Sequence, residues 1–331
     1  MMRRKTATRT IRKRCSDMKE IFLLSCAEVA EGGGVYKFGL TKRGKLERIS
    51  YLPCPKPMYS VLHNGRLHIL LRSPFEASGN SGYFSCREDL SDYSTLENTL
   101  GKCACHLSVD EDVYIANYLS GNIVKNCEES VTHTGKGVNQ PRQDAAHTHF
   151  TAFSPDEQYV LCCDLGLDTV YVYDKNLKQI SAASVPAGYG VRHLVFSKDG
   201  RFFYAVNELV PSVSVFAYAN GEAKYMSTTL LDCENKNSTA AAIRSDDEEG
   251  KIYISVRGKN KIFVFDVCGE TLRLSGSFSC GGSGPRDFNL TGKFIVCANE
   301  NSDNITVIDK KTYCVVEDLP MKNPLNVVMG K

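Results

Sequence analysis

The chain has no tryptophan among its 331 residues, and it lacks both the W-D and the G-H dipeptides that mark WD40 interaction repeats. It has no apolar stretch long enough to span a membrane and no C-x-x-C pair of the kind that binds zinc. A formal net charge of +2 leaves no strong field of one sign, such as nucleic-acid and membrane-surface proteins carry. We therefore expect a compact, soluble protein with neither of those partners.

Cysteine, by contrast, is abundant, with 14 residues. Cys26, Cys162, Cys163 and Cys297 lie within apolar runs, where a buried thiol behaves as a small hydrophobic side chain. The close pairs 103/105 and 162/163 have no companion cluster of metal ligands. Free thiols in this number are typical of a reducing compartment, so we expect a cytoplasmic protein.

The chain repeats one plan: an apolar run, a turn, a second apolar run that ends on a polar residue, another turn and a third apolar run. Clear copies occupy residues 105–125, 149–174, 193–218, 242–267 and 287–309. They recur about every 43–50 residues, which is the period of propeller blades and of some solenoids. Two degenerate copies, centred on residues 20–26 and 66–72, bring the number to seven.

The apolar runs have the composition of strands. HEAT-type helical repeats of similar period would place apolar residues at i, i+3 and i+4, whereas YVLCC, SVSVFAY and KIFVFDV are short, β-branched and aromatic. Seven four-stranded antiparallel sheets around one axis hide most strand edges. We predict an all-β fold, a single seven-bladed β-propeller over residues 19–331. The apolar segment 323–330 has no repeat of its own and is predicted to close the ring by completing the first blade.

Residues 1–18 form a separate basic segment that is rich in arginine. No apolar region follows it, so it is not a secretory signal. Its composition also resembles that of a transit peptide, but we interpret it as a disordered extension, with Met18 as an alternative start.

Repeat geometry predicts where a site should form. The first two strands of a blade are antiparallel, so the residue before the first strand and the residue that ends the second lie on the same face of the ring. Polar residues occupy both places and are expected to line one central opening. The first group contains His106, His147, His149, Arg192, His193, Arg286 and Asp287. The second contains Arg72, Asn117, Asp164, Asn207, Glu208, Arg257, Asn299 and Glu300, with Cys26 at the equivalent place in the first copy.

These residues allow different interpretations. An Asn or Asp at a strand end, such as Asn117, Asp164 or Asn299, commonly satisfies the backbone of the following turn. The arginines add little to a turn, and guanidinium groups that converge on one pocket would repel one another without an anionic ligand. A phosphate or carboxylate substrate is implied, and the sequence does not decide between them. Glu208 either pairs with an arginine or acts as a general base.

His147 and His149 form an H-x-H pair, and alternate residues of a strand face the same side. Both could reach one metal ion, with Asp164 or His106 as a third ligand. We favour substrate contact for His149 and a packing or hydrogen-bonding role beside the substrate for His147, and we predict neither a metal nor another cofactor.

Taken together, segments 135–174, 188–209, 254–266 and 284–309 resemble the seven-bladed β-propeller lactonases, which include bacterial 6-phosphogluconolactonase and the fungal carboxymuconate cyclases. The motifs that carry the resemblance are H-x-H at His147 and His149, R-H at Arg192 and His193, N-E-L at Asn207 to Leu209, R-G at Arg257 and Gly258, and G-P-R at Gly284 to Arg286. The resemblance implies a catalytic set of His149, Arg192, Glu208 and Arg257. The residues expected to contact the substrate are His147, His193, Asn207, Arg286 and Asn299. Val191 and Thr148 replace the family's usual prolines, and the first two blades are divergent, which leaves the identity of the acid open.

The expected activity is metal-independent hydrolysis of a sugar lactone, most closely 6-phosphogluconolactone, by a monomer whose only partner is its small anionic substrate. Water would attack the ring carbonyl while Glu208 or His149 takes its proton, and Arg192 or Arg257 would stabilise the oxyanion. Arg286 and a histidine would hold the phosphate. Two alternatives remain: a lactonase or cyclase acting on a polycarboxylate, and a propeller that only binds.

Overall fold

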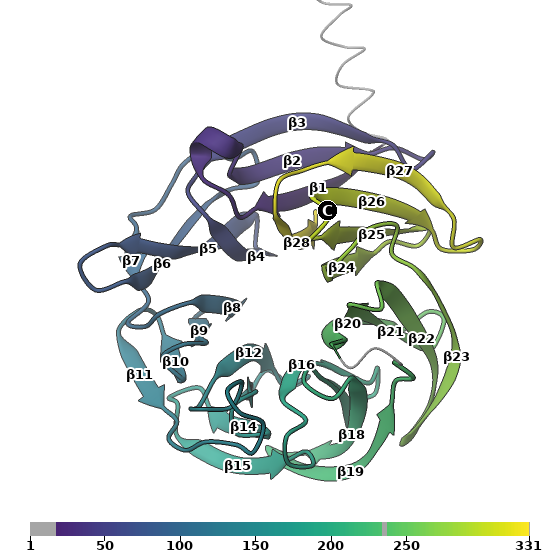
Figure 1. Cartoon of the computed structure of the whole chain (residues 1–331). Coiled ribbons are helices and arrows are strands. Elements are labelled where there is room, and N and C mark those ends of the chain that lie inside the picture. Colours follow the sequence, from purple (N-terminus) through teal and green to yellow (C-terminus); the bar gives the residue numbers. More distant parts are fainter. Residues whose placement is uncertain (1–17, 234–236, 331) are drawn as a thin grey trace, which may run out of the picture.

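The structure is a computed structural model that describes residues 18–233 and 237–330. Seven four-stranded antiparallel sheets surround a central axis (Figure 1). The one helical element of the described ranges is the short 3-10 helix η1 (Val29–Glu31), and no helix in them could cross a membrane. The predicted all-β, seven-bladed fold is confirmed, whereas the predicted basic extension lies almost entirely outside the described residues.

Each blade runs from an inner strand at the axis to an outer strand at the rim (Figure 1). In that order the strands are β28 (Pro324–Met329), β1 (Lys19–Ser25), β2 (Gly34–Leu40) and β3 (Leu46–Pro53) in blade 1; β4 (Pro57–His63), β5 (Arg66–Phe75), β6 (Asn80–Arg87) and β7 (Glu97–Asn98) in blade 2; β8 (Ala104–Val109), β9 (Val113–Asn117), β10 (Asn122–Lys125) and β11 (Glu129–Thr132) in blade 3; β12 (Thr148–Phe153), β13 (Tyr159–Asp164), β14 (Thr169–Asp174) and β15 (Gln179–Ser184) in blade 4; β16 (Val191–Phe196), β17 (Phe202–Asn207), β18 (Ser212–Ala219) and β19 (Glu222–Leu230) in blade 5; β20 (Thr239–Asp246), β21 (Lys251–Arg257), β22 (Lys261–Cys268) and β23 (Thr271–Ser279) in blade 6; and β24 (Pro285–Leu290), β25 (Phe294–Asn299), β26 (Asn304–Asp309) and β27 (Val315–Pro320) in blade 7.

Apolar side chains of neighbouring blades interdigitate to form the core. Between blades 4 and 5, for example, Leu161 and Val170 belong to the same buried cluster as Phe203 and Phe216, whose rings stack with centroids 4.6 Å apart. The middle strands are therefore buried on both faces, which explains their continuous β-branched and aromatic runs. This packing fixes the inner strands, and with them the residues that face the axis.

The C-terminal strand closes the ring as predicted, because β28 pairs antiparallel with β1. Asn326 on β28 adds a polar link between blades. Its Nδ2 donates to Oδ2 of Asp287 at 2.9 Å, and its Oδ1 accepts from the backbone N–H and the hydroxyl of Ser60 at 3.0 and 2.9 Å. One buried amide thus joins blades 7, 1 and 2.

Replacing Asn326 by alanine should lower the free energy of unfolding by about 2–4 kcal/mol, since three buried hydrogen bonds are lost and one of them has a charged acceptor. Asn289→Ala is the matched control, because that amide makes a half-buried bond to the Val327 carbonyl, and it should cost about 1 kcal/mol or less. Urea unfolding of both variants checks this, and equal losses would contradict the role given to Asn326.

A β-bulge recurs near the start of the inner strands. Pairing with the second strand slips by one residue in all seven blades. A bulge leaves its extra residue unpaired and redirects that side chain. The extra residues are Leu325, Met58, Cys105, His149, Arg192 and Arg286 in blades 1 to 5 and 7, and one of Ala241 and Ala242 in blade 6. Local irregularity therefore sends one side chain per blade toward the axis at the same level of the ring.

A backbone hydrogen bond marks a second set of equivalent positions. In six blades one residue at or near the end of the second strand makes the same backbone hydrogen bond. Its N–H donates to a carbonyl of the inner-strand segment, two residues before the bulged residue. The donors are Cys26, Arg72, Tyr118, Leu165, Glu208 and Glu300. The sequence alignment had placed Cys26 and Arg72 level with Asn117 and Asn207. The structure places them one residue later, level with Tyr118 and Glu208.

Candidate active site

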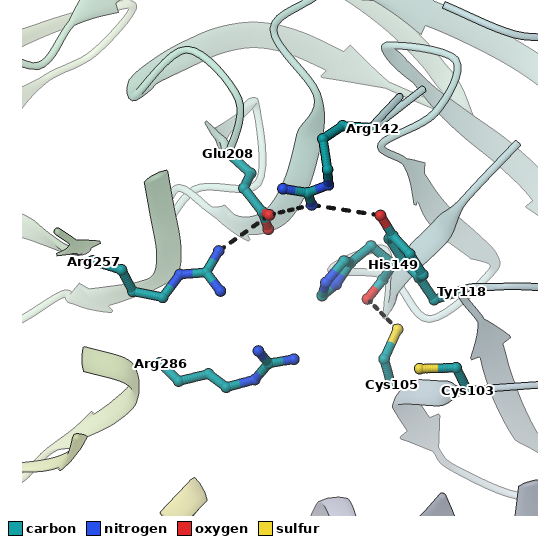
Figure 2. A pocket seen from close by; sticks show the side chains of 8 residues that line it. All are labelled: Cys103, Cys105, Tyr118, Arg142, His149, Glu208, Arg257 and Arg286. Atoms are coloured by element: carbon teal, nitrogen blue, oxygen red, sulfur yellow. Dashed lines mark hydrogen bonds and ion pairs between the residues drawn. The ribbon is translucent and has the colours of Figure 1, made fainter. Parts of the chain in front are cut away.

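A pocket of about 290 Å³ opens at the axis where these two sets of residues meet. Three bulged residues line it together with residues that end or follow second strands and two residues from connections between blades (Figure 2). The lining residues are Cys103, Cys105, Tyr118, Arg142, His149, Glu208, Arg257 and Arg286. The prediction that polar groups from several blades converge on one opening is therefore realised for His149, Glu208, Arg257 and Arg286.

The Glu208 carboxylate is buried among three guanidinium groups. Its Oε2 accepts from Nε of Arg192 at 2.8 Å, while its Oε1 accepts from Nη2 of Arg142 at 2.6 Å. Nη2 of Arg257 lies 3.1 Å from the same Oε1. Charge-assisted contacts of this kind are strong and directional. Glu208 thus holds the positions of two arginines that line the pocket.

The same contacts decide between the two roles that the sequence left open for Glu208. Burial tends to raise the pKa of its carboxyl group, but the charges of Arg257, Arg192 and Arg142 outweigh burial and hold this pKa well below its usual range. A carboxylate so stabilised is a weak proton acceptor. The geometry therefore favours the pairing role over that of a general base.

Arg192 lies behind the pocket wall rather than in it. Only 3% of the residue is exposed, and its Nη1 donates to the Ala241 carbonyl at 2.6 Å and lies 2.9 Å from Nε2 of His193. Burial, helped by repulsion from Arg257 and opposed by Glu208, lowers the Arg192 pKa to about 10, so the group stays charged at neutral pH. The contacts make Arg192 a buried partner of Glu208 behind the pocket wall, and the catalytic role expected for it stays a prediction.

Arg257 and Arg286 do reach the pocket (Figure 2). Nε of Arg257 is buried with no hydrogen-bond partner among the described residues. Nη1 of Arg286 contacts Oε2 of Glu300 at 3.2 Å, which leaves its other donors available. With Arg142, three guanidinium groups face a single lining carboxylate. The pocket therefore has a positive excess that suits an anionic ligand.

His149 is the uncharged member of the site. Its ring points into the pocket in Figure 2, and its buried Nδ1 has no hydrogen-bond partner among the described residues. Burial, followed by the charges of Arg192 and Arg286, holds the His149 pKa well below its usual range against the opposing effect of Glu208. The imidazole is therefore neutral at physiological pH, and its depressed pKa makes it a weak proton acceptor while the pocket is empty.

His147 and His193 were expected to contact the substrate, but neither lines the pocket. Nδ1 of His147 lies 2.9 Å from the Tyr118 carbonyl and its Nε2 lies 3.0 Å from Oδ1 of Asp144, and its ring stacks on that of Tyr118. His193 contacts Arg192 through Nε2. Both ring nitrogens of His147 have protein partners, whereas His193 uses Nε2 alone and its buried Nδ1 has no partner among the described residues. These contacts hold the two rings against Tyr118 and Arg192.

Asn207 and Asn299 also lie outside the pocket, contrary to the expected substrate contacts. Both are fully buried. Nδ2 of Asn207 donates to the hydroxyls of Ser212 and Ser214 at 2.9 and 2.8 Å, and Nδ2 of Asn299 donates to Oγ1 of Thr306 at 3.2 Å. Each of these two amides turns toward the third strand of its own blade, and in blade 5 the next residue, Glu208, lines the pocket.

The geometry does not support a metal site at the H-x-H pair. Both ring nitrogens of His147 have protein partners, and the Asp164 carboxylate accepts from the backbone of His147 and contacts His133 at 2.6 Å. Across residues 18–233 and 237–330, no three His, Cys, Asp or Glu side chains are grouped to hold an ion.

Cys105 lines the pocket as a thiol. Its Sγ lies 3.4 Å from the His149 carbonyl and 3.6 Å from the Thr148 carbonyl. Burial raises the pKa of this thiol, so it remains protonated at neutral pH and is a poor nucleophile.

Sequence reasoning missed Arg142 and Tyr118. Arg142 lies in residues 133–147, the longest connection between two blades of the described chain, and long ordered connections often carry functional groups. Tyr118 directly follows Asn117, which was singled out in its place. The length of the 133–147 connection could have pointed to Arg142, and the position directly after a strand-ending Asn could have pointed to Tyr118.

Comparison with known proteins identifies the family. A family model described as "Lactonase, 7-bladed beta-propeller" matches residues 21–318. The chain belongs to this lactonase family. It is 26% identical over 321 residues to a 6-phosphogluconolactonase of Formosa agariphila, with 87% of this chain and 91% of that protein covered. It is 30% identical over 311 residues to an uncharacterized protein of Staphylococcus saprophyticus, covering 85% and 89% of the two chains.

A crystal structure of a Lactobacillus plantarum protein has the same fold, with a TM-score of 0.86 and 26% identity over 95% of this chain and all of that one. The resemblance drawn from the H-x-H, R-H, N-E-L, R-G and G-P-R motifs is thereby confirmed at the level of the family. The pocket of this lactonase lies where those motifs meet.

Proposed function

We propose that this lactonase hydrolyses an anionic sugar lactone, with 6-phosphogluconolactone as the best-supported substrate and 6-phosphogluconate as the product. The observation that carries the proposal is the pocket itself, in which three guanidinium groups and a neutral His149 face one another around a single buried carboxylate. The relative from Formosa agariphila that is named 6-phosphogluconolactonase supports the choice of substrate.

The proposed roles follow from which donors and acceptors remain free. His149 takes a proton from water as the water oxygen bonds to the ring carbonyl carbon, and Arg257 donates to the carbonyl oxygen as it becomes an oxyanion. The ring C–O bond then breaks, and His149 returns the proton to the departing ring oxygen. Glu208 takes no proton in this scheme, because its role is to fix Arg257 and Arg142.

An anionic substrate also improves His149 as a base. The positive charges of Arg192 and Arg286 help to depress the His149 pKa in the empty pocket. A bound phosphate offsets part of that field, and the developing oxyanion offsets more, so the proton affinity of the imidazole rises as the reaction proceeds. The arginine cluster and the histidine base thus work together only with an anion in place.

Hydrolysis of freshly generated 6-phosphoglucono-δ-lactone by the full chain tests the proposal. Acid release should exceed the spontaneous rate and should resist a chelator. Arg257→Met should lower kcat by about 10²–10³-fold, the usual effect of removing an oxyanion donor. Arg273→Met, which removes an exposed arginine of β23 paired with Asp266, is the control and should leave kcat unchanged.

Two outcomes would overturn the substrate or the reaction. Turnover of a polycarboxylate lactone alone would transfer the activity to a carboxylate substrate, since guanidinium groups match both anions. No turnover of either lactone would leave a binding role.

We also propose a cytoplasmic location, which the free state of every cysteine in the described ranges supports.

A further inference from the structure

Arg72 of blade 2 occupies the position that Tyr118 and Glu208 occupy in blades 3 and 5. Its backbone N–H donates to the Lys56 carbonyl at 3.1 Å. Tyr118 and Glu208 make the same contact in their own blades, with Cys103 at 3.0 Å and Gly190 at 2.8 Å. Tyr118 and Glu208 line the pocket, whereas Cys26, Leu165 and Glu300 share the contact and do not. The equivalent backbone position therefore brings Arg72 to the level of the opening, and its neighbours show on which side it lies.

One side-chain contact and one backbone contact place Arg72 beside the pocket wall. Its Nε lies 3.2 Å from Sδ of Met58, the bulged residue of β4 and the counterpart of His149 and Arg286. Its backbone carbonyl accepts from the Ser81 hydroxyl at 2.6 Å, and that hydroxyl in turn accepts from the N–H of Ala104 at 2.8 Å. Ala104 lies between Cys103 and Cys105, both of which line the pocket.

The Arg72 guanidinium is exposed and has no carboxylate within ion-pair distance among the described residues. Its field overlaps that of Arg286, because both guanidinium groups lower the pKa of the Cys103 thiol against the larger raising effect of burial. Figure 2 shows Arg286 and Cys103 on the opposite side of the pocket from Glu208. On this side Arg286 pairs with Glu300, and Arg72 adds a second guanidinium without a carboxylate partner among the described residues, so the side keeps a net positive charge.

We infer that Arg72 and Arg286 form a subsite for the phosphate group of the substrate, and that Arg72 makes the enzyme prefer a phosphorylated lactone to a neutral one. The inference rests on the proposed function. A guanidinium that lacks a protein partner can give two parallel hydrogen bonds to phosphate oxygens. With the phosphate held on this side, the rest of a sugar lactone extends across the pocket toward His149 and Arg257.

Calorimetric titration of the full chain with 6-phosphogluconate and with gluconate tests the subsite without depending on turnover. The wild type should bind the phosphorylated acid more tightly, and Arg72→Met should reduce that preference about 10–100-fold, as expected for lost hydrogen bonds to a charged group. Arg72→Lys should restore part of the preference, since lysine keeps the positive charge but lacks the two parallel N–H donors of the guanidinium. Arg87→Met is the control. Arg87 ends β6 and lies opposite Arg66, the first residue of β5, in the strand ladder, whereas Arg72 lies toward the other end of β5.

The kinetic counterpart is a higher KM for 6-phosphogluconolactone in Arg72→Met with kcat unchanged. The subsite is wrong if the wild type shows no preference for the phosphorylated acid, or if Arg72→Met weakens both ligands equally. A lost preference without any lactone turnover would uphold the subsite and refute the proposed reaction. Normal lactone turnover together with an unchanged preference for the phosphorylated acid in Arg72→Met would uphold the proposed reaction and refute the subsite.

Discussion

His149→Gln should lower kcat for lactone hydrolysis about 10²–10⁴-fold, the usual contribution of a positioned general base. The residue is the bulged position of β12, its ring faces the pocket, and no described residue bonds its Nδ1. Fold stability should change little, because the ring gives up no protein hydrogen bond at that nitrogen. His63→Gln removes a histidine at the end of β4 away from the pocket and should leave kcat unchanged.

The pH profile of the wild type gives an independent check on His149. An ordinary histidine, with a pKa of about 6.5, would lose base activity as the pH falls from 7 to 6. Because burial and the neighbouring arginines hold the His149 pKa well below that value, kcat/KM for hydrolysis should stay flat through this range and fall only in more acidic solution. Retention of full kcat in His149→Gln, or a fall centred near pH 6.5, would contradict the assignment.

Glu208→Gln should lower the free energy of unfolding by about 3–5 kcal/mol, because removing one partner of a buried ion pair leaves the other charge unpaired. Arg192 is the group left behind, with Nε now facing a neutral amide. Activity should fall as well, since Arg257 and Arg142 lose their shared acceptor. Urea unfolding together with kcat/KM on the same preparations measures both effects.

The pH dependence of this effect has a defined sign. The folded-state pKa of Glu208 is depressed, so its contribution to stability is present above the unfolded value of about 4.3 and is lost only as the pH falls through the lower folded value. The stability difference between wild type and Glu208→Gln should therefore be constant from about pH 6 to 8. Asp266→Asn, which disturbs a partly exposed pair with Arg273, should cost about 1 kcal/mol or less. A Glu208→Gln protein of normal stability that has lost kcat alone would restore the general-base role.

The repeat allowed the fold to be predicted from sequence because the strand composition and the period both survive in five clear copies. Ring closure followed from the leftover apolar segment, which pairs with β1. The site was predicted in part. His149, Glu208, Arg257 and Arg286 were correctly brought together, since charged or imidazole side chains at fixed places in a repeat have few structural uses.

The remaining misassignments have one physical cause. A repeat pattern shows that a residue is near a strand end but not which way its side chain turns. The one-residue bulges on the inner strands and the turn after each second strand set that direction, so Asn207 points into its blade and Glu208 toward the axis. Arg142 could not be placed, because a loop outside the repeat has no counterpart to align.

The most direct test of the central claim, that the arginine-lined pocket binds and opens an anionic sugar lactone, is a crystal structure of the full chain with 6-phosphogluconate. We predict that the carboxylate of this product lies within hydrogen-bonding distance of Arg257 and His149, with its phosphate at Arg286 and Arg72. A product bound on another face of the propeller, or excluded from this pocket at saturating concentration, would contradict the account.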